Sequence, residues 1–225
     1  MEKKIELIQR LDFIKRVTTG KKVLHLGCTN FPYTKEAIDA DMLLHFELEK
    51  RAGQIYGFDF DQDGLDILKA HGTTNLFRAD LENLDDLPLD ETFDVIIAGE
   101  MIEHLNNPGL FLQGIQRFMN PGTRLVITTI NAYSGLRFLI YALRGKGGLN
   151  EPVHPDHVYY FSYRTLNLLI ERANLDVREF YFYDLGKEHR PHNPWYYNTA
   201  NDISVAISPQ LCDGLIAVCA LPSAK

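Results

Sequence analysis

The chain has 225 residues, of which 45% are hydrophobic and 24% charged, and its formal net charge is −7. This length and balance predict one soluble globular domain, residues 1–225, with room for a sizeable core. The acidic charge argues against a general nucleic-acid-binding role, which usually needs a basic excess.

The cysteine pattern and the apolar runs exclude further classes of protein. The three cysteines, Cys28, Cys212 and Cys219, show no CxxC spacing, so neither a disulfide framework nor a structural zinc site is expected. No apolar run reaches the roughly 18 to 20 residues that a membrane-spanning helix needs. The opening MEKKIELIQR lacks the uninterrupted apolar segment of a signal peptide. We therefore expect no membrane insertion and a cytoplasmic location. The sequence does not show which oligomeric state the chain adopts.

The first half of the chain alternates helices and strands. Apolar side chains recur near the helical period over residues 2–17 and predict an N-terminal helix within 1–19, which packs on the domain or covers a pocket. The next predicted elements are a strand at 22–27, a loop at 28–34, a helix within 35–51, a strand at 54–59, a helix at 63–72, a strand at 74–80 and a polar loop at 81–92. This alternation is typical of a parallel sheet with helices packed on it.

A strand-helix-strand unit follows. DVIIAG at 94–99 and RLVITTI at 124–130 have the length of strands buried on both faces. The Asn-Pro-Gly sequence at 120–122 predicts the turn that ends the helix between them. Four apolar residues at helical spacing predict that helix: Leu110, Phe111, Ile115 and Phe118. So short a unit implies parallel strands and a right-handed crossover.

After residue 131 the pattern is less regular. Ser162 is a predicted helix N-cap. The predicted elements are a helix at 133–144, irregular chain up to 162, a helix at 165–174, a strand at 176–184, a long loop at 186–199 and a buried strand at 214–221. The whole order predicts an α/β fold: a Rossmann-like, doubly wound, mostly parallel seven-stranded sheet with an antiparallel last strand and helices on both faces.

The loop at 99–105 is the first candidate for a functional site, because open α/β sheets bind ligands at the carboxyl ends of their strands. It contains Glu100, Glu103 and His104 in an E-x-x-E-H pattern. If a helical turn begins there, Glu100 and His104 share one face. Their oxygens and nitrogens are plausible ligands for a divalent metal ion. A substrate or cofactor pocket and a structural role remain alternatives, and a metal is not the expectation.

Five segments carry a resemblance to a known family. They are VLHLGC at 23–28, IYGFDFD at 55–61, FRADLENL at 77–84, FDVIIAGEMIEHLNNP at 93–108 with NPGTRLVITT at 120–129, and HPDHVYYFSYRTLNLLIERANLDV at 154–177. In this order and spacing they resemble the class I S-adenosylmethionine-dependent methyltransferases. The resemblance is strongest to small-molecule O-methyltransferases of the ubiquinone-biosynthesis type, and it covers roughly residues 20 to 185.

The resemblance implies a reaction and a cofactor. The chain is expected to transfer a methyl group from S-adenosyl-L-methionine to a small-molecule acceptor, at a hydroxyl oxygen. Residues 20–131 would form the cofactor-binding half, and residues 132–225 the substrate-side half. Similar ubiquinone-type enzymes carry the E-x-x-E-H spacing and use a metal there, whereas many other methyltransferases have a similar loop without one.

The glycine loop is the part that departs from the family pattern. Gly27 allows a positive φ and a close approach of the backbone to a ligand, and Cys28 and Thr29 follow it in the predicted cofactor loop. Thr29 stands where the family has a second glycine, and a β-branched residue resists positive φ. Asn30 tolerates that conformation better. His25 replaces the acid that the family carries before the loop.

The acid that ends the second strand is the next cofactor candidate. Asp59 suits a ribose diol, because a carboxylate accepts hydrogen bonds from two hydroxyls, and Asp61 is the runner-up. By resemblance, Asp80 would accept from the adenine amine while Leu81 gives a backbone contact. The other predicted cofactor contacts are Phe60 and Gly99.

Histidines supply the candidates for catalysis. A histidine is the usual group to take a hydroxyl proton near neutral pH. His157 is the first choice and His104 the second, although His157 equally suits a structural role. His157 is preceded by His154 and Asp156. The long late loop adds a possible lid over the substrate, or a segment that only packs down, with Trp195, Tyr196, Tyr197, His189, Arg190 and His192.

Two other functions remain open. The altered glycine loop, with Thr29 and His25, suits a non-catalytic methyltransferase-like module that binds a partner or another ligand. A nicotinamide-dependent oxidoreductase is the third reading, and the absence of a G-x-G-x-x-G pattern counts against it.

Overall fold

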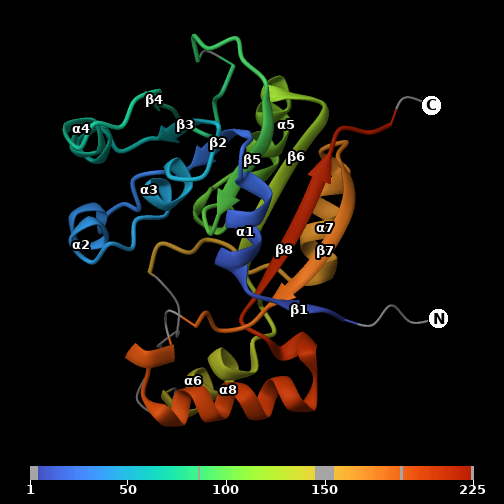
Figure 1. The fold of residues 1–225 in the computed structure, drawn as a ribbon. Coiled ribbons are helices and arrows are strands. Elements are labelled where there is room, and N and C mark those ends of the chain that lie inside the picture. The colour runs from blue at the N-terminus through green and yellow to red at the C-terminus, as the bar shows by residue number, and fades with distance from the viewer. Residues whose placement is uncertain (1–4, 86, 145–154, 188–189, 224–225) are drawn as a thin grey trace.

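The computed structural model describes residues 5–85, 87–144, 155–187 and 190–223 (Figure 1). The strands are β1 (Leu7–Ile8), β2 (Lys22–Leu26), β3 (Gln54–Asp59), β4 (Leu76–Arg78), β5 (Phe93–Gly99), β6 (Met119–Ile130), β7 (Asp176–Tyr183) and β8 (Gly214–Ala220). The α-helices are α1 (Arg10–Thr18), α2 (Thr34–Asp39), α3 (Leu44–Glu49), α4 (Gln62–Ala70), α5 (Pro108–Gly114), α6 (Gly135–Arg144), α7 (Tyr163–Arg172) and α8 (Trp195–Ile207). Short 3-10 helices are η1 (Ile102–His104), η2 (Ile115–Phe118), η4 (Arg190–His192) and η5 (Pro209–Leu211).

The strands form one sheet in the order β1-β7-β8-β6-β5-β2-β3-β4. All pairings are parallel except those that β8 makes with β6 and β7. The predicted mostly parallel sheet with an antiparallel last strand is therefore confirmed. It has eight strands rather than seven, because the two-residue β1 pairs with β7 at the edge. The chain order reverses between β2 and β5, and sheets of this kind bind ligands at such a switch point.

Helices cover both faces of the sheet, with α1 on one face and α5 and α7 on the other (Figure 1). Successive side chains of a strand point to opposite faces. In β5, Ile96 and Ala98 join the core beneath α5 and α7, whereas Val95 and Ile97 pack with α1. Helices α6 and α8 lie together beyond the carboxyl ends of the parallel strands, at the bottom of Figure 1.

Two predictions for the first half are wrong in detail. The N-terminal segment is not one helix, since Leu7 and Ile8 pair with β7 and the helix begins only at Arg10. The apolar residues of this segment suit a helix or a strand equally. The free edge of β7 favours the strand at Leu7 and Ile8. The region 35–51 forms two helices rather than one, because Asp41 adopts a φ of 53°, which ends helical geometry.

The second half also differs from expectation at two places. The segment 120–122, predicted as the turn that ends the helix, lies within a strand instead: the helical segment ends at Phe118, and β6 begins at Met119. The late loop is interrupted, because α8 begins at Trp195. The predicted cap at Ser162 is confirmed, since its hydroxyl accepts from the backbone N–H of Thr165 at 3.2 Å in a capping box.

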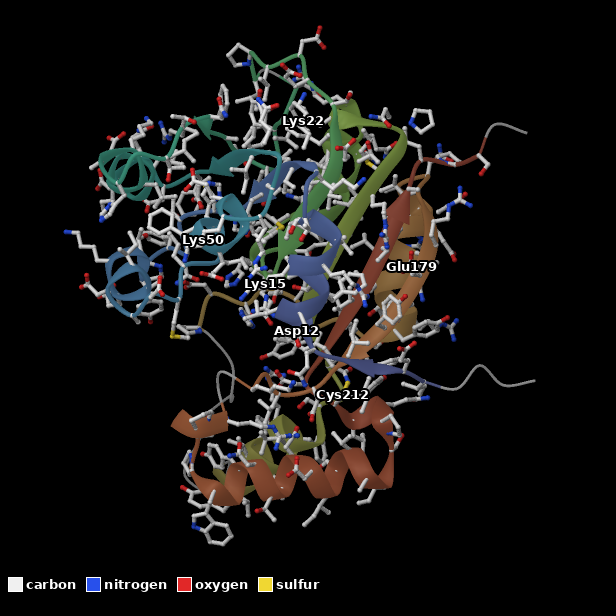
Figure 2. The ribbon with its side chains drawn as sticks, in the orientation of Figure 1. Asp12, Lys15, Lys22, Lys50, Glu179 and Cys212 are labelled. Atoms are coloured by element: carbon white, nitrogen blue, oxygen red, sulfur yellow. The ribbon has the colours of Figure 1, made fainter. Side chains whose placement is uncertain are left out.

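The described residues contain no helix that is both long and apolar enough to cross a membrane. Cys28, Cys212 and Cys219 are buried free thiols, so none of the three forms a disulfide. Cys212 lies between the sheet and helices α6 and α8 (Figure 2), at the edge where the candidate site is built.

Candidate functional site

The glycine loop after β2 places its unusual backbone at two residues. Gly27 has a φ of 69° and Asn30 a φ of 62°. Thr29 is not among the residues with positive φ. The chain thus meets the family's need for left-handed backbone with Gly27 and Asn30, and the β-branched Thr29 avoids that strain.

Thr29 joins the loop to the acid at the end of β3. Its backbone N–H and its hydroxyl donate to the same oxygen of Asp59, at 2.9 and 2.8 Å. The other oxygen of Asp59 accepts from the backbone N–H of Asp61 at 3.0 Å. Both Thr29 and Asp59 are buried. A carboxylate offers about four acceptor sites, so Asp59 keeps about one for a ligand.

Asp61, the runner-up for the ribose, has a structural task as well. Its side chain caps α4 by accepting from the backbone N–H of Gly64 at 3.0 Å. A Cβ at Gly64 would come within 2.3 Å of that carboxylate and 2.7 Å of Thr29. Glycine is therefore required where the loop, the cap and α4 meet.

A pair of buried histidines lies behind the glycine loop. Nδ1 of His25 is 3.1 Å from Nδ1 of His45, a residue of α3 to which no motif in the sequence points. Burial lowers the pKa of His45 to about 4. Burial, His45 and Arg10 hold the pKa of His25 well below its usual range. Both rings are neutral, so the Nδ1–H of one histidine donates a hydrogen bond to the unprotonated Nδ1 of the other.

Two exposed aromatic rings lie close to the end of β3. Phe60 is 59% exposed, and its ring meets that of Phe31, 52% exposed, at a centroid distance of 5.2 Å. Purine bases stack on such rings. Asp80, also exposed, accepts from the backbone N–H of Glu82 at 2.9 Å, and Leu81 lies between them in the chain. Two exposed aromatics beside Asp59 fit an adenosine-bearing cofactor, and Phe31 was not predicted.

The carboxyl end of β5, at Gly99, lies next to side chains of α1 and α3. A Cβ at Gly99 would have the guanidinium of Arg10 and the side chain of Leu44 as neighbours, each 3.9 Å away. Helix α1 and helix α3 thus approach the carboxyl end of β5 to within van der Waals contact of an added Cβ.

Glu100 does not share a face with His104, so that part of the metal hypothesis is wrong. Glu100 has a φ of 51°, and only residues 102–104 form a short 3-10 helix. Its carboxylate accepts from the hydroxyl of Tyr183 at 2.5 Å and lies 3.6 Å from the guanidinium of Arg10. Glu100 is therefore held on the side of α1 and β7.

Glu103, His104 and His157 come together instead. One ligand atom from each lies within 4.8 Å of the others, and the two imidazole rings are 4.6 Å apart. One oxygen of Glu103 accepts from the hydroxyl of Thr129 at 3.0 Å; the other has no hydrogen-bond partner among the described residues. Burial, with Glu100 adding to it, raises the pKa of Glu103 to about 8. This cluster can hold a metal ion or share a proton.

A cavity of about 330 Å³ opens at the carboxyl ends of β5, β6 and β7 and the start of β8. His157 lines this cavity, whereas His104 does not. Most of the other lining residues were not predicted, because they come from segments far apart in the sequence. The lining consists of Arg10, Glu100, Ile130, Arg137, His157, Tyr183, Asp184, Leu185, Gly186, Asn193 and Asp213.

Two contacts hold the wall of this cavity in place. Arg137 of α6 lies 2.7 Å from the carboxylate of the partly buried Asp213. Burial raises the pKa of Asp213, and Arg137 opposes that rise. The ring of Tyr183 packs directly on Gly214, where a Cβ would come within 2.3 Å of three ring and hydroxyl atoms. Only glycine at 214 lets the Tyr183 hydroxyl reach Glu100.

Among the described residues of the late segment, 186–199, the candidates for a lid do not come together at one site. Arg190 pairs with Asp184 and Asp202, at 3.0 and 2.7 Å. Trp195 is 76% exposed, and neither Tyr196 nor Tyr197 is among the residues that line the cavity. His154 and His189 lie outside the described residues.

Comparisons with known proteins show the family to which the chain belongs. A family model described as a methyltransferase domain matches residues 4–179. The ubiquinone biosynthesis O-methyltransferase of Hahella chejuensis is 29% identical over 129 residues, which are 54% of this chain and 49% of the relative. The chain thus spans about half the length of that relative. The enzyme of the same name from Pseudomonas aeruginosa is 23% identical over 199 residues, 83% of this chain and 75% of the relative.

A solved structure agrees with the fold. The crystal structure of an S-adenosylmethionine-dependent methyltransferase from Mesorhizobium loti has a TM-score of 0.58 and 15% identity, and the alignment covers 93% of this chain and 95% of that one. At this identity the match supports the fold alone. The family model, which covers most of the chain, supports more: the chain belongs to the methyltransferase domain family, the S-adenosylmethionine-dependent methyltransferases that its motifs resemble.

Proposed function

We propose that the chain transfers a methyl group from S-adenosyl-L-methionine to a hydroxyl oxygen of a small molecule. The observation that carries the acceptor side is the cavity at the carboxyl ends of the strands, with His157 in its wall. The curated relatives are named for ubiquinone biosynthesis, and a precursor of that kind is one acceptor within the proposal.

The cofactor would be held by the 20–131 half of a single domain. The candidate contacts all lie at the carboxyl ends of β2, β3, β4 and β5, and the exposed ring of Phe60 supports the placement of the adenine. They are Gly27, Cys28, Thr29, Asp59, Phe60, Asp80, Leu81 and Gly99. When bound, the cofactor supplies an electrophilic methyl group.

The 132–225 half would supply the proton acceptor and orient the substrate. His157 takes the hydroxyl proton at an imidazole nitrogen while the cavity holds the hydroxyl toward the methyl group. Glu103, whose pKa is raised to about 8, is neutral near pH 7 and lies beside both histidines. His104 is the second candidate for the base, since its ring contacts that of His157.

A metal-assisted reaction is the second candidate. It is favoured by the unsatisfied oxygen of Glu103 and by the proximity of His104 and His157. Imidazole and carboxylate ligands suit several divalent ions. The proposed ligand set is then Glu103, His104 and His157, with Glu100 outside it.

A cytoplasmic location belongs to the same proposal. It is supported by the three buried free thiols, which suit a reducing compartment.

Calorimetry with S-adenosylmethionine and S-adenosylhomocysteine tests the proposal. Binding of both, followed by turnover with an acceptor panel, is the expected result. If neither binds, the chain is a methyltransferase-like binding module, a reading motivated by the occupied Asp59 and the His25–His45 pair. A competition assay with NAD tests the oxidoreductase reading in the same experiment.

A further inference from the structure

The cavity beside His157 has a wall made almost wholly of polar groups. Eleven described residues line the cavity, and eight of them carry polar or ionisable side chains; Ile130 and Leu185 are the only apolar side chains among the eleven. Guanidinium and amide groups donate, carboxylates accept, and imidazole and phenol groups do both. A ligand of this cavity must therefore make many hydrogen bonds in several directions.

The charges in the wall are largely balanced. Arg137 lies 2.7 Å from Asp213, and Arg10 lies 3.6 Å from Glu100. The remaining acid, Asp184, is paired with Arg190 at 3.0 Å. Because each guanidinium already faces a carboxylate, the described residues of the wall offer no surplus positive charge to a phosphate or a carboxylate. A neutral ligand fits it better than an anion.

An ion pair does not use all the hydrogen bonds that its two groups can make. A carboxylate has about four acceptor sites and a guanidinium five N–H donors, more than a single ion pair takes up. In each pair an acceptor and a donor stand side by side. Two neighbouring hydroxyls suit this arrangement, because one donates to the carboxylate while the other accepts from the guanidinium.

The volume of the cavity also bears on the kind of ligand that it can bind. The cavity, about 330 Å³, lies at the lower end of the roughly 300–1,000 Å³ usual for small-molecule sites. It suits a single ring better than a ring with a long apolar tail. An apolar tail would cover Glu100, Asp184 and Arg137 without satisfying them, and burying polar groups in this way is costly.

We propose that this cavity binds a neutral polyhydroxylated ring, a sugar residue in chemical terms, and that one of its hydroxyls is the methyl acceptor. The inference rests on the proposed function and names its substrate class. The hydroxyl oxygen forms the new bond to the methyl carbon, the electron pair of the broken carbon–sulfur bond stays on sulfur, and the hydroxyl proton goes to His157. The products are a methyl ether, neutral S-adenosylhomocysteine and one proton.

The test uses the full chain with S-adenosylmethionine and two sets of probes. One set consists of methyl glycosides: methyl α-L-rhamnoside, methyl α-D-mannoside and methyl β-D-galactoside. The other is a catechol with an alkyl tail. Saturation-transfer NMR reports binding, and release of S-adenosylhomocysteine reports turnover. We expect saturation transfer to at least one glycoside, and turnover of it at least about tenfold above the rate without acceptor.

A matched pair of variants ties the result to the cavity. Asp184→Asn is expected to raise the KM for the glycoside about tenfold, the usual effect of losing a good hydrogen bond to a charged group, and to leave the Kd of S-adenosylmethionine unchanged. Asp176→Asn makes the same change at the other end of β7, where Asp176 pairs with Arg178 outside the cavity. It is expected to behave like the wild type.

The outcomes separate this inference from the proposed function. Turnover of the catechol without binding of any glycoside leaves the methyltransferase standing and overturns the sugar assignment. Equal KM values for Asp184→Asn and Asp176→Asn also overturn it. A chain that does not bind S-adenosylmethionine at all contradicts the proposed function itself, which calorimetry shows before any acceptor is added.

Discussion

Thr29 donates two hydrogen bonds to one oxygen of Asp59, from its backbone N–H and from its hydroxyl. The residue that departs from the family's glycine pattern thus joins the loop after β2 to the end of β3. These two hydrogen bonds hold the loop in place whether or not the cofactor is bound. They also occupy acceptor sites of the carboxylate that is predicted to hold the ribose. The loop of this chain is pre-organised by its own side chain rather than left open by glycine.

The first prediction concerns this tie. Thr29→Val keeps the shape of the side chain and removes the hydroxyl donor, which leaves a buried carboxylate oxygen with one bond fewer. We expect a loss of about 1.5–3 kcal/mol in the free energy of unfolding, as for other hydrogen bonds to charged groups. Urea denaturation measures it. Thr29→Ser keeps the donor and serves as the control; equal losses in both variants would assign the effect to packing.

The second prediction is a pH dependence caused by the His25–His45 pair. The pKa of His45 is lowered to about 4 in the folded state, whereas an unfolded histidine titrates near its model value of 6.5. Between these values the unfolded state binds more protons than the folded state, so stability falls as the pH falls. From about pH 7 to about pH 5 this amounts to about 2 kcal/mol for one such histidine.

Replacing the pair isolates this effect from that of the other titrating groups. In His25→Gln/His45→Gln the amides cannot take up a proton, so the difference in the free energy of unfolding between wild type and variant must shrink as the pH is lowered from about 7 to about 5. Denaturant midpoints at several pH values measure it. A constant difference across this range would show that the rings are not the source.

The third prediction concerns Tyr183 and Gly214. Gly214→Ala puts a Cβ within 2.3 Å of the Tyr183 ring, so it must displace that ring or strain β8. We expect a destabilisation of about 1–3 kcal/mol, typical of overpacking. In a Tyr183→Ala background the same change should cost far less. A double-mutant cycle measures this coupling, and additive losses would contradict the packing seen here.

The sheet was predictable where the pattern is local. β5, β6 and the capped helix α7 each carry their signal within a few residues: an apolar run, a second apolar run and Ser162. The segments that depend on distant partners were missed. Leu7 and Ile8 form a strand only because β7 offers a free edge.

The candidate site divides in the same way. The cofactor-side residues follow strand ends and could be found from the motif order, although the Thr29–Asp59 bonds could not. The acceptor cavity joins Arg10, Arg137, Tyr183 and Asp213, which lie in four separate segments. No spacing in the sequence indicates such a set, because only the folded sheet brings its members together.

The fourth prediction separates the two mechanisms of methyl transfer. If His157 is the base and no metal takes part, exhaustive dialysis against a chelator leaves turnover unchanged and Glu103→Gln keeps most of the activity. If Glu103, His104 and His157 hold an ion, chelation abolishes turnover, one divalent ion restores it, and Glu103→Gln lowers ion affinity about 10- to 100-fold or more. Turnover and bound-metal content, measured on the same samples, decide between them.

The last prediction concerns the base itself. His157 lines the cavity and His104 lies behind it, with their rings 4.6 Å apart. His157→Ala is therefore expected to lower kcat by about 10²–10⁴-fold, the usual contribution of a positioned general base, with the Kd of S-adenosylmethionine unchanged. His104→Ala is expected to lower kcat far less, because its ring contacts the base but not the cavity. The acid limb of the pH–rate profile should disappear only in His157→Ala, since that limb reports protonation of the base. Full activity in His157→Ala would show that another group accepts the proton. The ring of His157 would then have only a structural role, packing against the ring of His104.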